Sequence, residues 1–252
     1  GPRILLIGHL DTVFEPRSPF QKFERLTDST ARGPGIIDMK GGDVIIVEAL
    51  RALKAAGVLD GLSITVVMHG DEEDAGAPLD AARATLTDAA KRSQIALGFE
   101  DRSGDPHTAV ISRRSAGSWT LTTTGTPGHS SQIFRDDIGA GALYEASRIL
   151  DGFRTRLGGQ QYLTINPGVV LGGSEVKYDT AQSGGTAFGK TNVIAGQAIV
   201  SGDIRALSPE QLTQAMATMK ELVAQHLPKT TAELTFDDGY PPMAPTDGNR
   251  KL

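Results

Sequence analysis

The chain has 252 residues, of which 39% are hydrophobic and 22% charged, a composition typical of a globular protein with room for one large domain or two ordinary ones. Its formal net charge is −5 and no basic run stands out, which argues against nucleic acid or an anionic membrane as a partner. Cysteine is absent and no apolar stretch approaches the ~20 residues of a membrane span, so disulfides, thiolate metal ligands and a transmembrane helix are not expected.

The first hundred residues alternate short apolar runs with helical patterns. Three runs are predicted as strands: residues 3–8, 62–68 and 94–99. Two segments are predicted as helices: residues 43–56, which end at Gly57, and residues 77–92. Strands that alternate with helices favour an α/β domain with a largely parallel sheet, which we place at residues 1–113.

From about residue 114 the pattern changes to alternating strands and two amphipathic helices. The expected strands are residues 118–125, 162–171, 195–207 and 232–236, with a Gly-rich stretch at 172–189. The expected helices are residues 137–157 and one that starts at Ser208, an N-cap followed by Pro209 and by Gln211 at the capping-box position. This β-α-β-β-α-β order predicts a ferredoxin-like sandwich, residues 114–236, inserted into the first domain. Residues 237–252, with several prolines, are interpreted as a linker that returns to the first domain.

Imidazole and carboxylate side chains follow the predicted strands of the first domain or open its first helix. They are His9, Asp11, Asp38, Glu72, Glu73 and Glu100. The C-terminal ends of parallel strands line up along one edge of a sheet, so we expect these groups to converge. Imidazole with hard oxygen ligands favours a site for a divalent metal and metal-assisted hydrolysis.

Each of these motifs also has an ordinary structural explanation when it is taken alone. His9 and Asp11 could form a surface turn, and Asp38 could cap the helix that follows it. Glu72 and Glu73 could belong to a solvated acidic turn, since Asp71 and Asp74 extend the run. The occurrence of four such sites in order, each at a strand end or a helix start, favours the metal site.

Adjacent side chains past a strand end point in opposite directions, so one of Glu72 and Glu73 could bind metal while the other acts as a general base. A carboxylate such as Asp38 could bridge two cations, and the glycines around it permit close approach of the backbone. A metal-bound imidazole needs an acceptor on its other nitrogen, and Asp11 is two residues from His9.

Together the motifs resemble those of the co-catalytic zinc exopeptidases, the family of glutamate carboxypeptidase, aminoacylase and succinyl-diaminopimelate desuccinylase. The matching motifs are His9-x-Asp11-Thr12-Val13, Gly35-x-x-Asp38-Met39-Lys40-Gly41, Asp71-Glu72-Glu73, Phe99-Glu100, Gly128-His129-Ser130-Ser131, Thr191-Asn192-Val193-Ile194 and Gly202-Asp203-Ile204-Arg205. The resemblance covers essentially the whole chain, and the inserted lid falls where the family carries it.

The resemblance implies two zinc ions per active site, with cobalt or manganese as alternatives. His9, Asp38 and Glu100 would hold one ion, and Asp38 would bridge to a second ion bound by Glu73. In this family the peptide bond after the bridging aspartate is often cis.

The resemblance also implies roles for residues that do not bind metal. Asp11 would orient His9, and Glu72 would be the general base. From the lid, His129 would reach an active site, typically that of the partner subunit, and stabilise the oxyanion. Arg205, assisted by Asn192, would bind the terminal carboxylate of the substrate.

Without the resemblance, the lid motifs have plainer explanations. His129 would lie in a polar turn before a helix, and Arg205 would be an outward strand residue with a surface partner. The remaining histidines, His69, His107 and His226, are interpreted as structural or incidental, although His69 is close to the glutamate pair and could support the metal ligands from outside.

One departure from the family concerns the last histidine ligand, which the family supplies from a C-terminal segment beyond the position of Leu252. None of the five histidines can replace it by position. We therefore expect a fragment that lacks both ends of the catalytic domain, in which the second zinc site keeps only Asp38 and Glu73. The chain starts at Gly1 with no visible signal peptide, so the cytoplasm, the periplasm and secretion all stay open.

The expected function is hydrolysis of an amide bond next to a free carboxylate, as in a carboxypeptidase, a dipeptidase or an N-acyl amino acid amidohydrolase. The substrate would be a small peptide or an N-acyl amino acid, and the protein would form a homodimer through the lid. The alternative is a non-catalytic dimerising or ligand-binding relative, or a truncated and inactive product.

Overall fold

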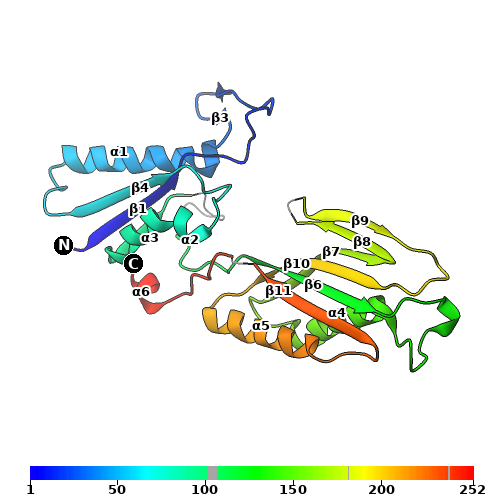
Figure 1. Ribbon diagram of the computed structural model, residues 1–252. Coiled ribbons are helices and arrows are strands. Elements are labelled where there is room, and N and C mark those ends of the chain that lie inside the picture. The colour runs from blue at the N-terminus through cyan, green and yellow to red at the C-terminus, as the bar shows by residue number, and fades with distance from the viewer. Residues whose placement is uncertain (101–106, 181, 238) are drawn as a thin grey trace. The chain divides into compact units, whose positions relative to one another are not determined.

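The computed structural model describes residues 1–100, 107–180, 182–237 and 239–252 (Figure 1). The chain divides into two compact units, Gly1–Ala109 and Val110–Leu252. Among the described residues, no helix combines the length and the apolar character that a membrane span requires.

The first unit contains a three-stranded sheet in the order β4-β1-β5, and both strand pairs are parallel. The central strand is β1 (Arg3–His9), flanked by β4 (Ser63–His69) and β5 (Ile95–Gly98). The register places His9 beside His69, so the two histidines end neighbouring strands at the same edge. The expected α/β unit with a parallel sheet is confirmed.

Helix α1 (Gly41–Ala55) packs against β1. The side of the helix that carries Ile46 is buried, and two of its valines face away. Ile46 is fully buried, whereas Val44 and Val47 are 60% and 47% exposed. Gly42 explains this orientation, because a Cβ there would lie 2.1 Å from the carbonyl oxygen of Phe99. The helix start therefore approaches the end of β5 on its glycine side, which turns the valines away from the sheet.

Several short elements complete the first unit. They are the strand pair β2 (Glu24–Arg25) and β3 (Ala31–Arg32), the π-helical turn η1 (Ile36–Lys40), and helices α2 (Leu79–Ala82) and α3 (Ala84–Lys91). The prediction of a single helix at residues 77–92 is wrong. Arg83, with φ −96° and ψ 4°, separates two shorter helices. The Asp38–Met39 peptide bond is cis, as the resemblance implied.

The second unit is an antiparallel sheet in the order β11-β6-β10-β7, with two helices packed on one face. In chain order its elements are β6 (Gly117–Gly125), η2 (Ser130–Gln132), α4 (Gly141–Leu157), β7 (Thr164–Gly173), β10 (Gln197–Arg205), α5 (Pro209–Val223) and β11 (Thr230–Phe236). This is the expected ferredoxin-like β-α-β-β-α-β order. Ser208 accepts a hydrogen bond from the Gln211 amide, so the predicted N-cap of α5 is confirmed.

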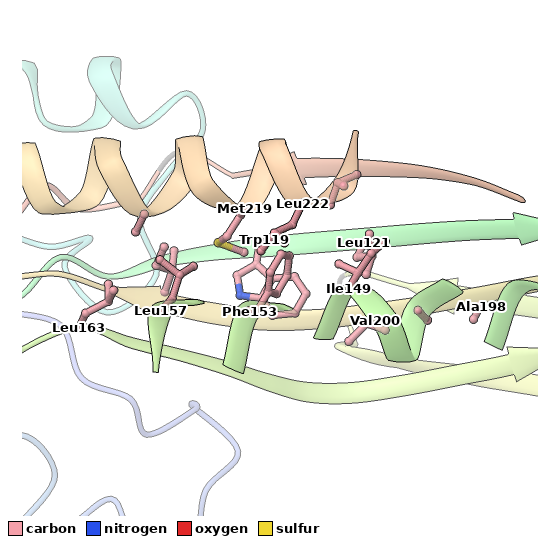
Figure 2. Packing of buried hydrophobic residues seen from close by; sticks show 14 of the residues in the cluster. Trp119, Leu121, Ile149, Phe153, Leu157, Leu163, Ala198, Val200, Met219 and Leu222 are labelled. Atoms are coloured by element: carbon pink, nitrogen blue, oxygen red, sulfur yellow. The ribbon is translucent and has the colours of Figure 1, made fainter. Parts of the chain in front are cut away.

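The core of the second unit lies between the sheet and helices α4 and α5 (Figure 2). Trp119 is fully buried and meets Phe153 edge to face, with ring centroids 5.6 Å apart. Its Nε1 donates a 3.0 Å hydrogen bond to the carbonyl oxygen of Asp203, so the buried indole has a polar partner. Met219 and Leu222 of α5 approach the same cluster in Figure 2.

Two parts of the second unit differ from the expected pattern. The Gly-rich stretch contains a hairpin, β8 (Glu175–Asp179) and β9 (Gly184–Phe188), where no strand was expected. The segment interpreted as a linker carries a short helix, α6 (Asp247–Lys251), started by the N-cap Thr246. Part of that segment also pairs with the start of the unit, through isolated bridges between Arg113 and Met243 and between Ala116 and Tyr240.

Candidate metal centre

His9 ends the central strand of the parallel sheet and is almost completely buried, with 1% of its surface exposed. Its Nδ1 lies 3.2 Å from Asp11 Oδ1, and its Nε2 lies 3.0 Å from Asp38 Oδ1. Burial opposes protonation of the imidazole, but the hydrogen bond to Asp38 and the charges of Glu72, Asp11 and Asp38 prevail and raise the pKa of His9. The ring therefore lies in a strongly negative environment that favours a cation.

Asp38 is placed by the turn η1 and does not act as the cap of α1. The residue before α1 is Lys40, and no side chain caps the helix there. Gly35 begins the turn with a φ of +69°, a conformation that glycine adopts without strain. The Asp38 side chain is about half exposed, so one oxygen faces His9 while the carboxylate keeps access to solvent.

Asp11 contacts both His9 and the turn that carries Glu73. One of its oxygens faces His9, and the other accepts a 2.9 Å hydrogen bond from the backbone amide of Glu73. Burial tends to raise the pKa of Asp11, but the backbone amides of Glu73 and Glu72 outweigh it and lower that pKa. Asp11 therefore remains a carboxylate, as a residue that orients His9 must.

Glu73 offers a carboxylate oxygen that is buried and has no hydrogen-bond partner in the described structure. Burial raises the pKa of Glu73, and the negative charges of Asp38 and Glu72 raise it further. A buried, partnerless carboxylate oxygen beside two other carboxylates is costly unless a cation lies between them. The site therefore fits a metal ion.

Two overlapping groups of side chains could each hold an ion. One contains His9, Asp38 and Glu100, and the other contains His9, Glu72 and Glu73. Within each group the potential ligand atoms lie within 4.8 Å of one another. One imidazole with several carboxylates suits zinc, and it also suits manganese or cobalt.

The structure thus brings together the six site residues that were predicted in the first unit. Glu100 reaches the site because it follows β5, whose last paired residue, Gly98, lies beside Ile7 of the central strand. Each of the other five lies at the end of β1, in η1 or in the turn after β4. The C-terminal edge of the sheet positions all of them.

The three predicted residues of the second unit fall into two places. The Ser130 amide, next to His129, donates a 2.9 Å hydrogen bond to the Asn192 carbonyl, so His129 and Asn192 are neighbours. His129 Nδ1 contacts Ser131 Oγ at 2.8 Å in the turn that starts η2. Both residues lie at the end of the sheet where β10 begins.

Arg205 lies at the opposite end of β10, as the last of the nine residues of a strand that begins at Gln197. A strand of this length separates its ends by about 26 Å, so one copy of the domain does not bring Arg205 and Asn192 together. The Arg205 side chain is half exposed, and its Nε donates to Asp203 Oδ2 at 2.9 Å.

Two residues close to the metal-binding groups were given no firm role from the sequence. His69 was noted as close to the glutamate pair but left out of the site, and its ring centroid lies 6.4 Å from that of His9 while its Nδ1 lies 3.2 Å from Asp71 Oδ1. The signal for His69 was available, because it ends a strand predicted to lie beside the strand of His9. The second residue, Arg83, was placed inside a helix, and no motif marked it.

Comparison with known proteins bears on both units. Residues 111–231 match the family model of the peptidase dimerisation domain of the M20 peptidases. Among curated proteins, carboxypeptidase G2 of Pseudomonas sp. (strain RS-16) is 27% identical over 100% of this chain and 56% of its own length. Aminoacylase-1 of Mus musculus is 29% identical over 98% of the chain and 60% of its own length. Acetylornithine deacetylase of Yersinia pestis is 28% identical over 97% of the chain and 61% of its own length.

The second unit therefore matches an M20 dimerisation domain, and the chain as a whole is similar to a carboxypeptidase, an aminoacylase and a deacetylase. It spans less than two thirds of the length of these curated relatives. Among solved structures, aminopeptidase PepT of Bacillus cereus aligns with a TM-score of 0.73 at 18% identity, over 98% of this chain and 61% of that one. A likeness at this level of identity shows that the chain shares the fold of that peptidase, and no more than the fold.

Proposed function

We propose that the protein is a metal-dependent hydrolase that cleaves an amide bond next to a free carboxylate, in a small peptide or an N-acyl amino acid. The observation that carries this proposal is the pair of overlapping ligand groups around His9, one with Asp38 and Glu100 and the other with Glu72 and Glu73. The names of the relatives, a carboxypeptidase, an aminoacylase and a deacetylase, support the reaction class.

In this proposal His9, Asp38 and Glu100 hold one zinc ion, and Asp38 with Glu73 contributes to a second. When bound, such ions polarise the scissile carbonyl and make water a stronger nucleophile near neutral pH. Asp11 keeps the His9 ring oriented through the 3.2 Å contact to Nδ1. Because Glu73 and Glu72 share one turn, a single short segment supplies a ligand and the catalytic base.

Glu72 is the proposed general base. It takes a proton from the attacking water as the new carbon–oxygen bond forms, and it passes that proton to the leaving nitrogen as the carbon–nitrogen bond breaks. The proximity of Glu72 to His9 and Glu73, with potential ligand atoms within 4.8 Å of one another, supports this role.

The second unit supplies the groups that recognise the substrate and the developing charge. Arg205 binds the free carboxylate, while His129 donates to the oxyanion and Asn192 lies beside it. A small peptide is much shorter than the sheet that separates Arg205 from His129, so two copies of the domain are needed to supply both. A homodimer through the dimerisation domain meets this requirement.

The direct test is Glu72→Gln in the full-length protein, assayed on dipeptides and N-acyl amino acids, with metal content measured on the same samples. We expect zinc to be retained and kcat to fall by roughly 10²–10⁴-fold, because the variant lacks a base. The matched control is Asp74→Asn, which removes a charge from an exposed neighbour in the same acidic run.

Wild-type turnover in Glu72→Gln would remove that residue from the mechanism. A wild-type protein that dimerises but holds no metal and cleaves none of these substrates would favour a non-catalytic relative instead.

A further inference from the structure

Arg83 lies in the break between α2 and α3, and its side chain is only 10% exposed. Its guanidinium reaches back to the acidic turn that follows β4. Nη2 donates to the carbonyl oxygen of Asp71 at 2.8 Å and lies 3.4 Å from the carbonyl oxygen of Glu72. Nη1 lies 3.0 Å from Asp71 Oδ1. A buried cation is therefore committed to the backbone of a turn that carries two of the predicted site residues.

The two carbonyl groups belong to the peptide units on either side of the Cα atom of Glu72. One planar guanidinium that holds both units restricts the backbone angles of Glu72, and so it restricts the direction in which that side chain leaves the turn. A lysine at the same position would offer one nitrogen in place of the fork, in which Nη2 reaches the two carbonyl oxygens while Nη1 lies 3.0 Å from Asp71 Oδ1.

The turn is fixed at further points. Asp71 Oδ1 also lies 3.2 Å from Nδ1 of His69, the last residue of β4. On the metal-binding side, the Glu73 amide donates to Asp11 Oδ2, whose partner oxygen faces His9. The turn is thus held through its carbonyls by Arg83 and through its amide by Asp11.

We propose that Arg83 is a positioning residue for Glu72, which it directs toward the cation site by clamping the two adjacent peptide units. This role rests on the proposed function, in which Glu72 is the general base. In this role Arg83 acts through the backbone of the turn, and it is not proposed to bind substrate or metal.

The clamp can be tested without any assay of activity. Arg83→Met removes the donors and keeps an unbranched side chain, and Arg92→Met, at the exposed end of α3, is the matched control. By hydrogen exchange, we expect the amides of residues 71–74 to exchange at least tenfold faster in Arg83→Met, because their turn loses its fixed carbonyls. Amides of β1 and those of the Arg92→Met control should exchange at the wild-type rate.

The consequence for catalysis is tested in the metal-loaded, full-length protein. We expect Arg83→Met to lower kcat by about 10–100-fold with KM within about twofold of wild type, because substrate contacts are unchanged while the base is misdirected. Millimolar ethylguanidinium should restore part of kcat to Arg83→Ala, since it refills the donor site. A merely structural arginine would lower the melting temperature and leave the kcat of folded enzyme, and its rescue, unchanged.

The outcomes separate the clamp from the proposed function. If wild-type protein neither binds metal nor hydrolyses any substrate, the proposed function fails, and the exchange experiment still decides the clamp. Unchanged exchange in a folded Arg83→Met protein overturns the clamp, and so does faster exchange with wild-type kcat in an active enzyme. If Arg83→Met does not fold, Arg83→Lys takes its place, and wild-type exchange and kcat in that variant overturn the proposal.

Discussion

At His9, both ring nitrogens face carboxylate oxygens and almost no surface is exposed. This arrangement would let a cation take the place of a proton on Nε2, while Nδ1 lies 3.2 Å from Asp11 Oδ1. The same carboxylates that raise the pKa of His9 also make the site attractive to a divalent ion. Protons and metal ions therefore compete for one side chain.

That competition predicts a pH dependence of zinc affinity. Metal binding needs neutral His9, so below the raised pKa of His9 each pH unit should weaken zinc binding by about tenfold. Affinity should rise with pH and level off above that pKa. Zinc titrations between pH 5 and 8 in a buffer that does not bind metal would measure this. A zinc affinity that stays constant from pH 5 to 7 would remove His9 from the ligand set.

Among the secondary-structure elements, the order of strands and helices could be predicted because apolar runs mark the strands and capping residues mark the helix starts. The strand that ends at His9 and the capped helix that begins at Pro209 are examples. The hairpin of β8 and β9 could not, because β8 is largely polar, β9 begins with two glycines, and the two strands form a sheet of their own. The break at Arg83 could not either, because a tertiary contact to the acidic turn, and no local signal, accounts for it.

The candidate site was predictable for a related reason. The residues that end parallel strands share an edge, so the positions of His9, Glu72 and Glu73 followed from the sheet. The separation of Asn192 from Arg205 was also present in the sequence, since a whole predicted strand lies between them. Because that strand separates the two residues within one copy, a joint role on one carboxylate stays a prediction that needs Asn192 and Arg205 from two copies.

A buried ion pair within α4 also links that helix to α5, because its arginine reaches an α5 carbonyl group. Glu145, which has no exposed surface, lies 2.6 Å from Arg148 and accepts a 3.0 Å hydrogen bond from the Leu227 amide. Arg148 also donates to the Leu222 carbonyl near the end of α5. Burial acts to raise the pKa of Glu145, but the Arg148 hydrogen bond, the Leu227 amide and the charge of Arg148 lower it overall.

This pair predicts how the stability of the second unit changes with pH. Because the folded pKa lies below the unfolded one, the stabilisation is complete above the ordinary glutamate range and is lost as pH falls through the folded pKa. Glu145→Gln should cost about 3 kcal/mol at pH 7 and flatten the acid limb of the profile, as measured by urea unfolding. The control Glu221→Gln, on the surface of α5, should change stability by less than ~1 kcal/mol. Equal effects of the two variants would contradict this account.

At the scale of the whole molecule, the proposed dimer makes a prediction about mixed subunits. Each active site would need Arg205 from one copy and His129 from the other, so each single variant should be inactive. When His129→Ala and Arg205→Ala proteins are mixed and allowed to exchange subunits, half the dimers are mixed and one of their two sites is intact. The mixture should recover about one quarter of wild-type activity. A mixture that stays inactive after subunit exchange, verified by mass spectrometry, would contradict shared sites.

His9, Asp38, Glu73 and Glu100 are the residues proposed to surround two metal ions. The most direct measurement is zinc content per chain in the full-length protein after dialysis against excess zinc and then against metal-free buffer. Wild type and the exposed control Asp74→Asn should each retain about two zinc ions. Asp38→Asn, which weakens the bridging ligand, should retain about one or none. Two zinc ions in Asp38→Asn, or none in wild type, would contradict the account.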